Sequence, residues 1–184
     1  MHKTENLINK IIPNVKRPDG KDREWFNNDE ILSELNKEEL KIVEERLISM
    51  LKTNDDTLIP QTLIKLKSLN SIPTMVEKLE LIRDPFNRIT WASFINELKN
   101  GDIEMEKIAF TEFQKLEFIY EIQGVIFHDL IKFNSSRINN RIKEFIDHKY
   151  FLVAHHAKKV LNLNKDSKPH SKSTEPKLWW EFWK

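Results

Sequence analysis

Residues 71–101, SIPTMVEKLELIRDPFNRITWASFINELKNG, carry the start and stop signals of two consecutive helices. Pro73 lies in the first turn of one helix, and Asp84-Pro85 supplies a capping carboxylate and a first-turn proline for the other. Asn100-Gly101 then gives a left-handed stop. The apolar residues recur every three or four positions, as Ile72, Met75, Val76, Leu79 and Ile82, then Phe86, Ile89, Ala92, Ile95 and Leu98. Two helices with so short a connection have to lie antiparallel or steeply folded against each other.

The same spacing continues toward both ends of the chain. Asn36 followed by Glu39 is typical of a capping box and predicts a helix over roughly 37–53, and a shorter helix begins near Pro60. A further start signal is Asn134-Ser135-Ser136. The apolar positions of the last two helices are Ile138, Ile142, Phe145 and Ile146, then Val153, Ala157, Val160 and Leu161. Because the β-branched residues also fall at helical spacing, the sequence predicts an all-α fold.

The stretch 102–133 leaves two alternatives open. Its apolar residues run on at helical spacing, so it forms either one long helix or two shorter ones. Gly124 costs about 1 kcal/mol relative to Ala inside a helix. We therefore favour a break within 116–124.

The composition limits the class of protein. The chain has 184 residues, 39% of them apolar and 32% charged, with 3 Gly and no Cys. This length favours one domain, and the absence of Cys excludes disulfides, thiolate catalysis and cysteine-ligated zinc. No window approaches roughly 18 consecutive apolar residues, and 1–13 has no uninterrupted apolar stretch of the kind a secretory signal needs. We expect a cytoplasmic protein.

We divide the chain into three parts. Residues 1–28 hold Pro13, Pro18 and Gly20 and are interpreted as an N-terminal arm with one helical turn around 7–12. Residues 29–163 form the helical domain. Residues 164–184 combine a polar, proline-punctuated linker with an aromatic C-terminal segment.

Two segments of the helical domain share a pattern. In 71–98 and 137–161 a short apolar-striped helix, a few turn residues and a second helix follow one another, and the second segment contains Val153-Ala154 and Val160-Leu161. This pattern resembles the HEAT-like (armadillo-like) helical-repeat family. The resemblance implies antiparallel helix pairs stacked as a short α-solenoid, which would bind a partner along its surfaces. An irregular helical bundle is the alternative, because many bundles satisfy the same loose apolar pattern.

Two groups of residues are candidates for contact with a partner. The stretch 134–163 carries 6 Lys and Arg against 2 Asp and Glu, and its candidate residues are Arg137, Arg141, Lys158 and Lys159. The aromatic segment carries Trp179, Trp180, Phe182 and Trp183, and thus three of the five Trp of the chain. It either folds into a groove of its own domain, or binds another protein, since Trp is a frequent hot-spot residue, or lies at a membrane interface.

The titratable residues do not predict a catalytic or metal site. His155 and His156 are neighbours on a helix, so their side chains diverge by about 100°, although His148 could meet one of them across the preceding turn. Glu44-Glu45 and Asp55-Asp56 are paired only in sequence, and acid–base catalysis needs carboxylates that face one substrate. The three glycines stand apart, so no glycine-rich phosphate loop is present. We expect no cofactor and no metal.

These observations predict a non-enzymatic protein–protein interaction module of the adaptor or immunity type. The alternative is a HEAT-like DNA-binding protein or an alkylation-repair DNA glycosylase, in which Arg88 and Trp91 would line an aromatic, cationic groove. The body of the chain lacks the basic excess that duplex binding normally requires, so the sequence disfavours nucleic acid as the partner.

Overall fold

The computed structural model describes residues 2–11, 28–118 and 120–163, and in these ranges the chain forms helices and no strand. The all-α prediction is confirmed there. The α-helices are α1 His2–Ile11, α2 Asp29–Ser33, α3 Lys37–Leu51, α4 Leu58–Lys65, α5 Ile72–Leu81, α6 Pro85–Leu98, α7 Ile103–Lys115, α8 Phe127–Leu130, α9 Ser136–Lys143 and α10 Phe151–Val160. Short 3₁₀ helices add η1 Leu69–Ser71, η2 Glu121–Ile126 and η3 Ile131–Phe133.

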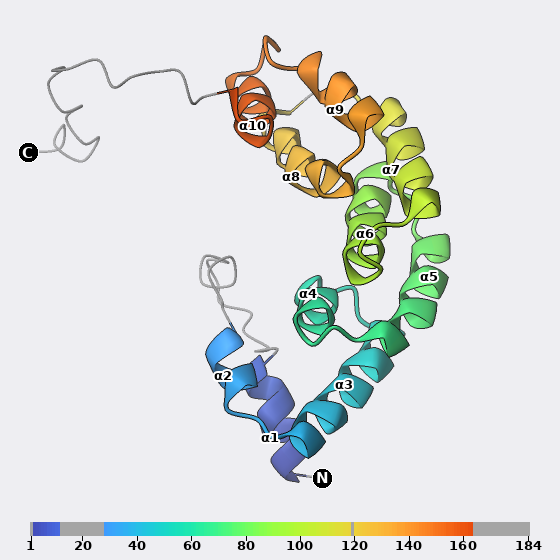
Figure 1. Cartoon of the computed structure of the whole chain (residues 1–184), viewed down its shortest axis with the longest axis vertical. Coiled ribbons are helices and arrows are strands. Elements are labelled where there is room, and N and C mark those ends of the chain that lie inside the picture. Colours follow the sequence, from blue (N-terminus) through green and yellow to red (C-terminus); the bar gives the residue numbers. More distant parts are fainter. Residues whose placement is uncertain (1, 12–27, 119, 164–184) are drawn as a thin grey trace, which may run out of the picture.

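The helices from α3 onward form a curved array with two rows (Figure 1). Helices α3, α5, α7 and α9 follow one another along the outer side of the curve, and α4, α6, α8 and α10 along the inner side. Neighbours within the inner row pack on one another, as α4 on α6, α6 on α8 and α8 on α10, while α6 packs most extensively on α7. Membership of the HEAT-like family, and a solenoid in the sense of that family, stay predictions.

The predicted caps are present. The Asn36 side chain accepts hydrogen bonds from the backbone N–H groups of Glu38 and Glu39, and the Asn36 N–H donates to the Glu39 carboxylate, so α3 begins with a capping box. The Asp84 carboxylate accepts from the Asn87 N–H at 2.8 Å and starts α6. After α6, Asn100 and Gly101 both have positive φ, at 54° and 112°. These helix ends follow from local chemistry, as predicted.

The break expected within 116–124 is also present. Helix α7 ends at Lys115, and η2, α8 and η3 follow as three short pieces in place of one long helix. Gly124 explains part of this arrangement, because a Cβ at this position would lie 2.9 Å from Cα of Val153 and 3.2 Å from the carbonyl oxygen of Leu152. The absence of a side chain thus lets the backbone of η2 lie directly on α10.

The N-terminal residues contribute more than the single helical turn that we expected. Helix α1 has ten residues, and its Ile8 and Ile11 are buried in the core. Asn28 is buried between α1 and α4, where its amide donates to Oγ1 of Thr62 at 2.7 Å and to the carbonyl of Ile11 at 3.4 Å. Its carbonyl oxygen accepts from Nζ of Lys65 at 2.9 Å. Asn28 therefore joins α1 to the array.

Helix α6 lies at the centre of the array. It contacts α4, α5, α7 and α8, and its residues 91–96 are all buried. A helix surrounded in this way has no solvent-exposed face over that stretch. This explains why six consecutive residues, polar as well as apolar, are buried there. Among the described residues, no helix combines the length and the apolar character that crossing a membrane would require.

Candidate partner-binding surface

The arginines predicted to contact a partner are engaged within the fold. On α9, Nε of Arg137 donates to Oε1 of Glu106 on α7 at 2.9 Å, and its guanidinium lies 4.7 Å from the ring centroid of Phe110. The hydroxyl of Ser135 also donates to the Glu106 carboxylate. These two hydrogen bonds, that of Ser135 first, lower the pKa of Glu106. Arg137 therefore joins α9 to α7.

Arg141, one helical turn further along α9, lies over an aromatic cluster. Its guanidinium is 5.3 Å from the ring centroid of Phe145 and 6.0 Å from that of Phe113, and it pairs with Glu144. The rings of Phe113, Phe118, Phe127 and Phe145 contact one another below it. Arg141 covers part of this cluster and contributes cation–π contacts, so its guanidinium packs within the fold.

The other two predicted residues lie on α10, which ends the inner row. Lys159 is exposed, and Nζ of Lys158 lies 3.5 Å from the carboxylate of Asp147. Two residues that sequence reasoning did not select lie on the same helix: Phe151, which is 72% exposed, and His155, whose ring stacks on that of Phe151 at 5.8 Å and 23°. Phe151, His155 and Lys159 are four residues apart, so they share one side of the helix. We call these three residues the α10 stripe.

The opposite side of α10 holds the helix in place. Val153 and Ala157 are buried there, and Val153 lies against Gly124 of η2. The described residues leave the α10 stripe uncovered. An exposed aromatic ring is common as an isolated feature. Here the ring is that of Phe151, the first residue of α10; it stacks on the imidazole of His155 and is followed on the helix by two lysines. Such a combination offers an apolar anchor with a cationic rim.

A histidine pair lies beside the stripe. Nε2 of His128 on α8 is 3.0 Å from Nδ1 of His156 on α10. Burial, and after it the charge of Lys159, lowers the pKa of His128, while burial and the neighbouring His128 lower the pKa of His156. No local pattern in the sequence indicates this pair, because its members are 28 positions apart. His148, the neighbour that we considered for His155 or His156, instead contacts the rings of Phe118, Phe145 and Tyr150.

The residues next to the pair are already engaged. The Asp129 carboxylate accepts from Oγ1 of Thr90 at 2.9 Å and from Nζ of Lys132 at 3.1 Å. Lys132 also lies 3.6 Å from the carboxylate of Glu97. In the part of the chain that the structure describes, no three or more His, Asp or Glu side chains converge as metal ligands would. Two histidines alone do not complete a zinc site.

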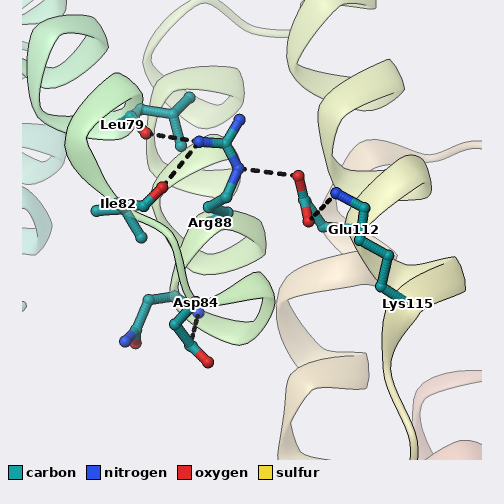
Figure 2. A network of polar contacts seen from close by, with 7 residues as sticks. Leu79, Ile82, Asp84, Arg88, Glu112 and Lys115 are labelled. Carbon is teal, nitrogen blue, oxygen red and sulfur yellow. Dashed lines mark hydrogen bonds and ion pairs between the residues drawn. The ribbon is translucent and has the colours of Figure 1, made fainter.

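Arg88, considered together with Trp91 for a nucleic-acid groove, holds helices together (Figure 2). Nη1 of Arg88 donates to the carbonyl oxygens of Leu79 and Ile82 at 2.9 and 3.0 Å, where α5 ends. Its Nε donates to Oε1 of Glu112 at 2.9 Å, and Nζ of Lys115 donates to the other carboxylate oxygen. Trp91 is only 3% exposed. These two residues therefore present no open aromatic, cationic surface.

Two surface hollows border the inner row. One of about 390 Å³ is lined by Ile64, Lys67, Leu69, Glu97, Leu98 and Asn100. The other, of about 450 Å³, is lined by Asp55, Thr57, Lys78, Leu81, Ile82, Asn87 and Trp91, and two of these residues, Lys78 and Asp55, form an ion pair of 2.5 Å.

The aromatic candidates Trp179, Trp180, Phe182 and Trp183 lie outside the described residues. Comparison of the chain with protein-family models, with curated proteins and with solved structures finds no match. The physical properties of the α10 stripe are therefore the basis for a functional proposal.

Proposed function

We propose that this chain is a non-enzymatic helical-repeat module that binds another protein, in an adaptor or immunity-type role. Its contact surface is the α10 stripe, and the aromatic C-terminal segment, 178–184, supplies a second contact. The observation that carries the proposal is Phe151, which begins the last helix of the array and is 72% exposed. Aromatic side chains that become buried on binding are frequent energetic centres of protein interfaces.

The charges around Phe151 indicate the kind of partner. His155, Lys158 and Lys159 follow it on the same helix, and Lys158 pairs with Asp147. A partner with an apolar pocket and acidic residues around its edge would match this surface in shape and charge. The curved, stacked arrangement of helices supports the proposal, because such arrays expose extended surfaces on which partners bind.

Photocrosslinking tests the contact surface directly. We would place p-benzoylphenylalanine at position 151 in the full chain and look for adducts in the native cells. The matched control is position 103, because Ile103 also begins a helix and is 71% exposed. We expect one protein to crosslink at 151 and not at 103, and Lys159→Glu to weaken that adduct. Equal labelling at both positions, or no adduct at 151, would contradict the proposal.

A second measurement distinguishes the DNA-binding alternative. Fluorescence anisotropy of a short duplex, recorded with the full chain at two salt concentrations, should show no binding if the partner is a protein. Salt-sensitive binding would favour the alternative, because affinity for the phosphate backbone falls steeply with salt. The fold gives that alternative little support, since Arg88, Arg137 and Arg141 all have acidic or carbonyl partners within the array.

A further inference from the structure

The contact between α8 and α10 contains the hydrogen-bonded pair His128 and His156, and we propose that this pair is a pH-sensitive latch that holds α10 in the array. The latch itself depends on the fold alone. Its consequence for partner binding rests on the proposed function, because the α10 stripe lies on the helix that the latch holds.

The chemistry of the pair requires at least one neutral ring. With Nε2 of His128 and Nδ1 of His156 at 3.0 Å, one nitrogen donates its proton and the other accepts it through its lone pair. When both rings are protonated, two N–H groups face each other and both rings carry positive charge. The hydrogen bond is then lost, and the two positive charges repel each other across the contact between α8 and α10.

The surroundings favour the neutral state. From α10, Lys159 and His155 lie near the pair, and from α8 and η3, Asp129 and Lys132 do. Asp129, the one carboxylate among them, is held by Thr90 of α6 and by Lys132. On the η2 side the ring of His156 faces Gly124, which has no side chain to offer. Burial and these cations both lower the pKa values of the pair, so protonation requires a pH below the ordinary histidine range.

Helix α10 has few other anchors, so loss of the pair should loosen it. Its buried side chains are Val153 and Ala157, which are small, and it packs chiefly on η2 and α8. Protonation would therefore release the last helix of the inner row while the central helices stay packed. Below the transition, the α10 stripe would lose its fixed position beside α8.

Hydrogen exchange of the full chain tests the latch. We would compare the protection of α10 amides with that of α3, which contains no histidine, between pH 7.5 and 5, after correction for the intrinsic exchange rate. In the wild type, the ratio of α10 protection to α3 protection should fall as the pH is lowered. The fall should be about tenfold for each pH unit by which the folded-state pKa of a latch histidine lies below its unfolded value. A constant ratio would overturn the proposal.

Two variants separate the pair from other histidines. The double variant H128Q/H156N keeps a hydrogen-bonding atom near each position of Nε2 and Nδ1 but does not titrate, so its ratio should stay flat with pH. His155→Asn is the control on the same helix. It should keep the pH response of the wild type, with a midpoint at higher pH because His155 no longer lowers the pKa of His156. An equal pH response in H128Q/H156N would also overturn the latch.

A readout on the unmodified chain guards against misfolding of the variants. In a histidine NMR titration of the wild type, His128 and His156 should titrate below the ordinary histidine pKa of about 6.5, and together with the loss of α10 protection. Titration of both residues at or above that value would contradict the latch. Because no partner is present in these measurements, they do not depend on the proposed function, which crosslinking at pH 7.5 tests separately.

Discussion

Nε of Arg88 on α6 lies 2.9 Å from Oε1 of Glu112 on α7, and the Glu112 residue is only 6% exposed. The same guanidinium donates to the carbonyls of Leu79 and Ile82 at the C-terminal end of α5. One side chain thus joins three successive helices (Figure 2). This contact lies in the most extensively packed part of the array, between α6 and α7.

Arg88→Ala should therefore lower the free energy of unfolding by about 3 kcal/mol, because the buried Glu112 carboxylate and the carbonyls of Leu79 and Ile82 all lose the Arg88 donor. Urea denaturation at pH 7 measures the change. Lys107→Ala removes an exposed ion pair with Glu104 and is the control, with an expected effect of under about 1 kcal/mol. If Arg88→Ala costs no more than Lys107→Ala, the three-helix junction does not stabilise the fold.

Gly124→Ala should destabilise the contact of η2 with α10. The new Cβ would lie 2.9 Å from Cα of Val153, a backbone atom that cannot rotate away, so we expect a cost of about 1–3 kcal/mol. Hydrogen exchange should locate the loss of protection in α10. Gly101 is the control. Its φ is 112°, and a Cβ added there would meet no atom within 4 Å apart from its chain neighbours. Gly101→Ala should therefore act through backbone strain and leave the protection of α10 relative to α3 unchanged. The same α10 signature in both variants would contradict this reasoning.

The helix boundaries were predictable because the signals for them are local. Asn36 and Glu39 are three residues apart, and Asp84 and the Asn100-Gly101 stop act within one turn of the helices they limit. The break before Gly124 was also predicted. Its cause was not, because the reason for a glycine there is the backbone of α10, almost thirty residues later.

The contacts between helices were predicted less well. Arg137 and Arg141 have the spacing of a basic face, but α7 lies beside them and supplies Glu106 and the aromatic rings. One signal was available and unused: Glu112 follows Ala109 by three residues, on the apolar stripe of α7. A carboxylate on such a stripe needs a cationic partner, although the sequence alone does not identify it as Arg88.

The stability of the fold should rise with pH through the range in which the histidine pair titrates. The pKa values of His128 and His156 are lowered in the folded state, so the unfolded chain binds more protons there. This contribution is fully present above the ordinary histidine pKa of about 6.5 and is lost as the pH falls through the lowered values. The urea midpoint should therefore decrease as the pH is lowered from 7.5 to 5. In H128Q/H156N this decrease should be smaller.

The contribution of Glu106 belongs to a different window. Its pKa is lowered by Ser135 and then by Arg137, so its stabilisation is present above the ordinary glutamate pKa of about 4.3 and is lost below it. Glu106→Gln should change the pH dependence of the urea midpoint below pH 5. It should leave unchanged the part of that dependence that comes from the histidine pair. A change confined to the range above pH 6 would assign the effect to other groups.

Asn28 should determine whether α1 stays on the array. Its side chain is fully buried and uses both its amide and its carbonyl, on Thr62, Ile11 and Lys65, so Asn28→Ala leaves three polar groups without this partner. We expect a loss of about 1–3 kcal/mol, with the hydrogen-exchange protection of α1 falling more than that of α6. Asn36→Ala is the control, because it removes a cap worth about 1 kcal/mol from α3 without touching α1. If α1 keeps its protection in Asn28→Ala, the burial of Ile8 and Ile11 alone holds this helix in place.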